Sequence, residues 1–75
     1  MKLIRKISIG SDLKSGAMAF SVGQYMNLKG SQYKIHNIKE NEKSYDVYIE
    51  KEDEVLPWKT FNKNMAIAIE YDLDY

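Results

Sequence analysis

The chain has 75 residues, of which 44% are apolar, and it carries 11 basic and 11 acidic side chains, no cysteine and one proline. This length allows one small domain, 1–75, with a core that needs no disulfide bond. The composition excludes a membrane span, a collagen-like repeat and a disulfide scaffold. With no cysteine and a single histidine, the usual zinc and redox sites are excluded as well, so we expect neither a metal nor a cofactor.

Apolar and polar residues alternate along most of the chain, and this pattern predicts β-strands. The first strand is expected at 2–9 and the second at 17–22, on either side of a Gly- and Ser-rich loop at 10–16. Residues 24–31 are predicted to form a loop with a short extended piece, ending in a Gly-Ser turn. The amino-terminal half therefore contributes two strands and two loops.

The middle of the chain predicts a hairpin. Its strands are expected at 32–39 and 44–51, joined by a polar turn at 40–43, with a change of alternation at Asn37. A second charged turn at 51–54 follows. This hairpin is the most strongly patterned element before the end of the chain.

The segment after the second charged turn has two interpretations. Either 55–61 is an edge strand broken at Pro57, or Pro57 begins a single helical turn. After a turn at 62–64, residues 65–73 alternate for nine positions and predict the final strand.

Five to six short antiparallel strands predict a small β-barrel or a strongly bent sheet. An SH3-like barrel is the first choice, with a helical turn at 57–62 before the last strand. An OB-like barrel, or an open meander that dimerises, is the alternative. The expected core is the set of alternating apolar residues Ile7, Ile9, Phe20, Val22, Ile35, Val47, Ile49, Ile67 and Ile69.

The segment LPWKTFNKN is the densest mixture of stacking surface, positive charge and amide groups in the chain. Exposed Trp and Tyr anchor protein interfaces, and aromatic rings beside lysines also bind bases and phosphates. In a purely structural role, Trp58 and Phe61 would instead close one end of the barrel. The candidate binding residues are Trp58, Lys59, Phe61, Asn62, Tyr48 and, from the 10–16 loop, Lys14.

No catalytic constellation is present in the sequence. His36 is the sole imidazole, and no Ser-containing elbow motif accompanies it. We therefore expect a binding module without catalysis, whose ligand is a protein partner or an anionic small molecule. A small barrel that binds single-stranded nucleic acid is the alternative, although a net charge of zero counts against it.

Self-association is also expected. The apolar strands at 3–9 and 65–73 lie near the chain ends, where uncovered edges invite pairing. Residues 1–39 carry seven basic and one acidic side chain, whereas 40–75 carry four basic and ten acidic ones. Such opposite charge favours the register of neighbouring copies in a homo-oligomer.

The segments KLIRKISIG, AMAFSVGQ, VYIEK, WKTFNKNM and AIEYDLDY resemble the small uncharacterised accessory proteins of tailed bacteriophages that infect low-GC hosts. This resemblance implies an early accessory protein that acts in the cytoplasm of the host. It also implies binding of a host factor, or sequestration of a defence signal such as a cyclic nucleotide. No apolar run of signal-peptide length opens the chain, which agrees with a cytoplasmic location and no membrane partner.

Overall fold

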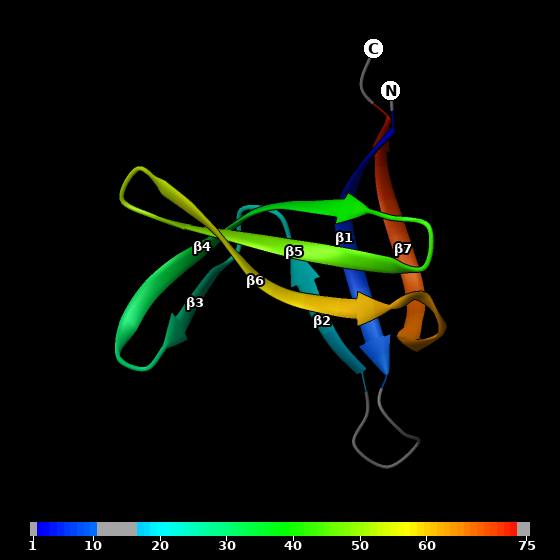
Figure 1. Ribbon diagram of the computed structural model, residues 1–75, viewed down its shortest axis with the longest axis horizontal. Helices are drawn as coiled ribbons and strands as arrows, with labels where there is room; N and C mark the ends of the chain where they lie inside the picture. The colour runs from blue at the N-terminus through cyan, green and yellow to red at the C-terminus, as the bar shows by residue number, and fades with distance from the viewer. Residues whose placement is uncertain (1, 11–16, 74–75) are drawn as a thin grey trace.

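The computed structural model describes residues 2–10 and 17–73, which form seven β-strands and one short 3-10 helix (Figure 1). The elements in chain order are β1 (Lys2–Gly10), β2 (Ala17–Ser21), β3 (Tyr25–Leu28), β4 (Ser31–Glu40), β5 (Ser44–Lys51), β6 (Glu54–Asn62), η1 (Lys63–Met65) and β7 (Ala66–Leu73). The prediction of an all-β fold is confirmed, with seven strands instead of five to six.

The strands form two antiparallel sheets, in the orders β2-β1-β7 and β3-β4-β5-β6. Figure 1 shows β4, β5 and β6 running across the front of β1 and β7 in a clearly different direction. β6 and β7 each pair on one side only, so the described strands do not close into a barrel. β1 lies in the centre of its sheet, and the expectation that the first strand forms an edge is therefore wrong.

A corner between β2 and β3 connects the two sheets. The Val22 N–H donates to the Arg5 carbonyl of β1 at 2.8 Å, and the Gly23 N–H donates to the Ile35 carbonyl of β4 at 2.9 Å. Gly23 has φ +91°, a conformation that residues with a side chain rarely adopt. The chain thus leaves one sheet and enters the other within three residues, 22–24.

The segment predicted as a loop at 24–31 is instead a strand and a tight hairpin turn. β3 pairs with β4 from Tyr25 opposite Lys34 to Leu28 opposite Ser31. Two-residue hairpin turns of the type that matches strand twist need positive φ at both central positions. Lys29 has φ 52° and Gly30 has φ 84°, so this turn fits in only two residues.

The core lies between the two sheets, and the buried residues of the described chain are all aliphatic or aromatic. Its buried residues are Ile4, Ile7, Ile9, Phe20, Ile35, Ile38, Tyr45, Val47 and Ile49. Six of the nine predicted core residues are in this set. Val22 and Ile67 are exposed, Ile69 is partly buried, and the additions are Ile4, Ile38 and Tyr45.

Irregularities in strand pairing explain most of these differences. The β1–β7 register shifts between Ile4 and Lys6, so both Ile4 and Ile7 face the core although they are three residues apart. A second shift, between Ser8 and Ile9, leaves Ile67 as the extra residue of β7. A β-bulge of this kind reverses the alternation of the residues beyond it.

β6 confirms the edge-strand interpretation of the segment around Pro57. Pro57 pairs with Tyr48, and the register shift between Val47 and Tyr48 leaves Trp58 as the extra residue of β6. Proline is tolerated here because one side of an edge strand needs no N–H donor. The expected helical turn lies further along, at η1, and not at 57–62.

Candidate ligand-binding groove

A groove of about 530 Å³ lies between the β3–β4 hairpin and β6, with β5 contributing to its lining. Its volume is within the range of pockets that hold small molecules. The lining is mainly apolar and aromatic: Leu28, Tyr33, Ile49, Leu56, Pro57 and Trp58, together with Asn27, Lys29 and Ser31.

Tyr33 forms one wall of the groove and carries a lysine beside its ring. The Lys51 Nζ atom lies 5.6 Å from the centroid of the Tyr33 ring. The same ammonium group donates a hydrogen bond to Ser31 Oγ at 3.2 Å, which ties the end of β5 to the start of β4. A cation placed over an aromatic face is attracted by the negative face of the ring.

Trp58 forms the opposite wall and has the same kind of neighbour. The Lys59 Nζ atom lies 5.4 Å from the centroid of the Trp58 ring. The ring is held from the core side by Phe20, in an edge-to-face contact with centroids 5.3 Å apart. Trp58 is therefore half-buried and fixed in orientation, because the bulge in β6 directs it toward the core.

Lys29 is the single charged residue in the lining of the groove. Lys51 and Lys59 lie near the Tyr33 and Trp58 rings but are not part of the lining, and Lys51 also lines a separate pocket with Glu50, Glu52 and Asp53. The side chains of Asn27 and Ser31 add polar groups to the lining. An anionic ligand with a flat apolar part matches this combination of cations and rings.

The structure separates the binding residues that the sequence predicted. Trp58 lines the groove and Lys59 lies against its ring, whereas Phe61 stacks on Phe20 with centroids 5.7 Å apart and packs against the core. Asn62 is exposed, directly before η1, and its side chain makes no capping hydrogen bond. Lys14 lies outside the described residues.

Tyr48 does not line the groove. It alternates with the buried Val47 and Ile49 along β5, and its side chain is half-buried on the other face of the sheet. The sequence reasoning missed Tyr33, Lys29 and Lys51 as site residues. The signal that was available is the Lys29-Gly30 pair, since a two-residue turn there folds β3 back onto β4 and brings Tyr33 near Trp58.

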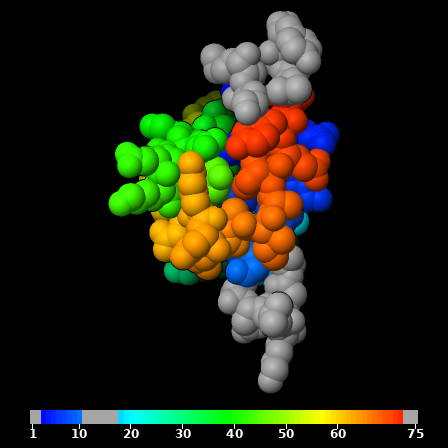
Figure 2. All heavy atoms as spheres, turned by 90° about the vertical axis from the view of Figure 1, so that its right-hand side faces the viewer, coloured from blue at the N-terminus to red at the C-terminus, as the bar shows by residue number. Residues whose placement is uncertain are grey.

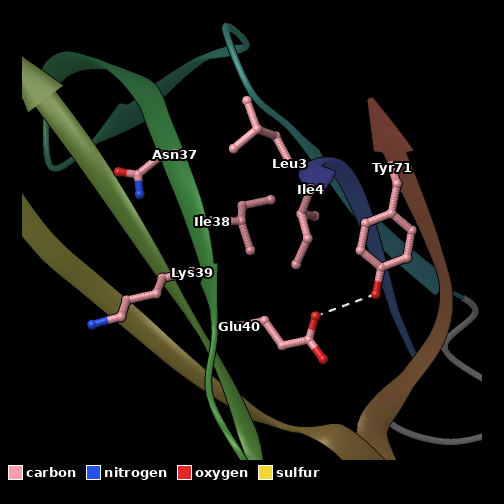
Figure 3. A pocket seen from close by; sticks show the side chains of 7 residues that line it. All are labelled: Leu3, Ile4, Asn37, Ile38, Lys39, Glu40 and Tyr71. Atoms are coloured by element: carbon pink, nitrogen blue, oxygen red, sulfur yellow. Dashed lines mark hydrogen bonds between the residues drawn. The ribbon is translucent and has the colours of Figure 1, made fainter. Parts of the chain in front are cut away.

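A second, smaller pocket of about 330 Å³ lies where β4 meets β1 and β7 (Figure 3). Glu40 points into it and accepts hydrogen bonds from Tyr71 Oη at 3.3 Å and from Lys63 Nζ at 2.8 Å. The bond to Glu40 raises the pKa of Lys63, and burial followed by the charge of Glu40 raises the pKa of Tyr71. These contacts connect β4 to η1 and β7.

A further polar contact joins β4 to β5 on the surface of the molecule. The Nδ1 atom of His36 lies 3.3 Å from Oε1 of Glu50, and both side chains are on the surface. Within residues 2–10 and 17–73, no three His, Cys, Asp or Glu side chains are grouped so that they could hold a metal ion. The same part of the chain contains no helix with the length and apolarity needed to cross a membrane.

The described residues form a small two-sheet β protein with a groove whose lining is mainly apolar and aromatic. Comparison of the chain with protein-family models, with curated proteins and with solved structures finds no match.

Proposed function

We propose that this protein is a non-catalytic binding module that holds an anionic ligand with a flat ring, of the nucleotide class, in the groove between Tyr33 and Trp58. One observation carries the proposal: two aromatic walls, each with a lysine at its ring, face one groove whose lining contains no carboxylate. The module acts by occupancy, so each bound ligand is withdrawn from solution.

Different residues of the groove recognise different parts of the ligand. A base stacks on the aromatic rings, because every base has a π face that packs against such a surface. The ammonium groups of Lys29, Lys51 and Lys59 are the phosphate partners. Asn27 and Ser31 supply hydrogen bonds to the polar edges of the ligand.

The biological setting follows from the resemblance to phage accessory proteins. In that setting the groove sequesters a nucleotide signal of host defence, in the host cytoplasm. Occupation of the same groove by a host protein is the competing form of inhibition. A nucleotide is favoured because the groove is small, about 530 Å³, and because the one charged residue in its lining is Lys29.

The strand order supports the assignment of this two-sheet fold as SH3-like. β1 pairs with the last strand, a corner carries the chain from one sheet to the other, and the short helix η1 precedes the last strand. In this assignment β6 is an additional strand.

Trp58 provides the test, because it is the only tryptophan of the chain and lies in the groove. Titration with cyclic AMP, AMP and a cyclic dinucleotide is expected to change its fluorescence with saturation at one site per chain. Tyr33→Leu removes one stacking surface and is expected to weaken binding by about 5- to 150-fold, since a base stack contributes about 1 to 3 kcal/mol. Tyr25→Leu, at an exposed tyrosine outside the groove, is the matched control and is expected to leave affinity unchanged.

Oligonucleotides separate this function from single-strand binding. A nucleotide site gives the same affinity for one nucleotide as for a ten-nucleotide strand, whereas a strand-binding surface gains affinity with length and loses it steeply with salt. No fluorescence response to any of the nucleotides at millimolar concentration contradicts the proposal. Equal losses in Tyr33→Leu and Tyr25→Leu contradict the placement of the site.

A further inference from the structure

The charge inside the groove limits the ligands that it can hold. Lys29 of the β3–β4 turn is the one charged residue in the lining, and β6 contributes only the apolar residues Leu56, Pro57 and Trp58. Each phosphate charge beyond the first therefore has no cation of its own within the lining. A charge held in such a place loses solvation that no partner replaces.

Carboxylates lie beside the Tyr33 wall of the groove. Tyr33 also lines a neighbouring pocket of about 290 Å³, whose charged residues are two lysines and three carboxylates: Lys34, Lys51, Glu50, Glu52 and Asp53. This pocket thus has one more acidic than basic residue. Because the groove and the pocket share Tyr33, these carboxylates are close enough to act on a charged ligand of the groove.

Two of the three carboxylates are not balanced by a basic side chain. Glu50 lies 4.0 Å from Lys34. Glu52 and Asp53 form the turn between β5 and β6, which we call the acidic turn, and both are exposed. None of the ion pairs within the described part of the chain includes either of them. The acidic turn is therefore a local source of negative potential.

The acidic turn and the β3–β4 turn lie at the same end of the molecule, on the left in Figure 1. The groove lies between the β3–β4 hairpin and β6, so a turn with a lysine and a turn with two carboxylates flank it. One phosphate at Lys29 has a partner. Further phosphates that extend beyond Lys29 approach the acidic turn, where like charges repel.

We propose that the groove selects a nucleotide with a single negative charge, of the cyclic mononucleotide class, and that the acidic turn rejects polyphosphates such as ATP. This inference rests on the proposed function, because it names the ligand of the same groove. Repulsion of the wrong ligand is a general source of specificity. A module that acts by occupancy needs such a device, since ATP is abundant in cells and would otherwise fill the groove.

The first test compares cyclic AMP, AMP and ATP, which share one base and one sugar and differ in phosphate charge. Titrations followed by Trp58 fluorescence, without Mg²⁺ to neutralise the phosphates, give the three dissociation constants. We expect the affinity to fall in that order, with ATP at least about 10-fold weaker than cyclic AMP. Equal or tighter binding of ATP overturns the selection and leaves the proposed function intact. No saturable response to any of the three overturns both.

The second test removes the charge of the acidic turn. Glu52→Gln combined with Asp53→Asn keeps the size of both side chains and is expected to narrow the ratio of the ATP and cyclic AMP dissociation constants by about 3-fold or more. The affinity for cyclic AMP is expected to change by less than about 2-fold, because its one charge is paired with Lys29.

The matched control removes the same charge elsewhere. Glu42→Gln combined with Asp72→Asn changes two exposed carboxylates outside the groove and is expected to leave the ratio as in the wild-type protein. Figure 2 shows the end of the molecule opposite to the two turns, where the β4–β5 turn and β7, which carry these positions, face the viewer. An unchanged ratio in the acidic-turn variant, or equal narrowing in both variants, overturns the role of the acidic turn.

Salt distinguishes repulsion from steric exclusion of a longer phosphate chain. An increase from about 0.05 M to about 0.5 M salt shortens the range over which exposed charges interact, so the ratio for the wild-type protein is expected to fall. Steric exclusion gives a ratio that does not change with salt, and a net attraction of ATP gives a ratio that rises. Either of these results overturns the proposal.

Discussion

Leu3 and Ile4 are consecutive and similar in size, but Leu3 is exposed and Ile4 is buried. Ile4 is 7% exposed and belongs to the core, whereas Leu3 is 52% exposed. Strict alternation back from Ile9 and Ile7 would place Leu3, and not Ile4, on the core side of β1. The extra residue Arg5 reverses that order, and a bulge of one residue leaves no clear mark in so short a sequence.

Substitutions at Leu3 and Ile4 test whether the bulge at Arg5 turns Ile4 toward the core. Ile4→Ala is expected to lower the free energy of unfolding by about 2 to 5 kcal/mol, because a large core side chain is lost and the space is only partly refilled. Leu3→Ala is expected to lower it by less than about 0.5 kcal/mol, as at other surface positions. Urea denaturation of both variants checks the difference, and a larger cost for Leu3→Ala means that the alternation is unbroken.

The protonation of Asp46 is coupled to the fold through two side-chain hydrogen bonds. Its carboxylate accepts hydrogen bonds from Thr60 Oγ1 at 2.7 Å and from Asn41 Nδ2 at 2.8 Å. These two bonds, the one from Thr60 first, lower the pKa of Asp46 below its ordinary value of 3.8. The stability that the carboxylate contributes is thus fully present above the pKa of the unfolded chain and is lost as the pH falls through the folded pKa.

Removal of the Thr60 hydroxyl is therefore expected to act mainly on the acid side. Thr60→Val raises the pKa of Asp46 toward that of the unfolded chain, so the free energy of unfolding falls less steeply below about pH 4. Thr60→Ser keeps the donor and is expected to keep the wild-type slope. Urea titrations at a series of pH values measure this, and identical slopes in all three proteins assign the acid sensitivity to other groups.

The β3–β4 hairpin is the element that the sequence predicted least well and on which the groove most depends. The prediction failed because β3 is short and its alternation is weak, while the turn uses Lys29 in a conformation that favours glycine or asparagine. The β4–β5 hairpin was predicted correctly, including the change at Asn37, since Tyr45, Val47 and Ile49 alternate without interruption. The aromatic segment of β6 was recognised, but the wall opposite Trp58 was not.

Substitution of Lys29 is expected to have different effects on the stability of the fold and on ligand binding. Lys29→Gly relieves the positive φ and is expected to keep or raise the free energy of unfolding, by up to about 1 kcal/mol. The same change removes the only charged lining residue and is expected to weaken nucleotide binding. Lys39→Gly on β4, which removes an exposed lysine outside the groove, is the affinity control. Unchanged affinity in Lys29→Gly excludes this lysine as a phosphate partner.

At the scale of the whole molecule, the opposite charges of the two halves of the sequence interleave. Glu70 of the last strand lies between Arg5 and Lys6 of the first, and Lys34 of β4 lies 4.0 Å from Glu50 of β5. These pairs are exposed, so each contributes little to stability. Their arrangement follows from topology, because β1 and β7 come from opposite ends of the sequence and pair directly. The order of the strands could not be predicted from alternation, which marks strands but not their partners.

The two walls of the groove belong to separate hairpins, and this has a consequence for the energetics of binding. The β3–β4 turn and the β5–β6 turn are each held by local strand pairing, and the two hairpins are joined by the β4–β5 pairing and by the hydrogen bond from Lys51 to Ser31. Such tips open locally at a free energy well below that of global unfolding. A ligand that touches both walls suppresses both openings at once, so part of its binding free energy is consumed in ordering the hairpins. A substitution that makes either turn more rigid is then expected to raise the affinity for the ligand without any new contact.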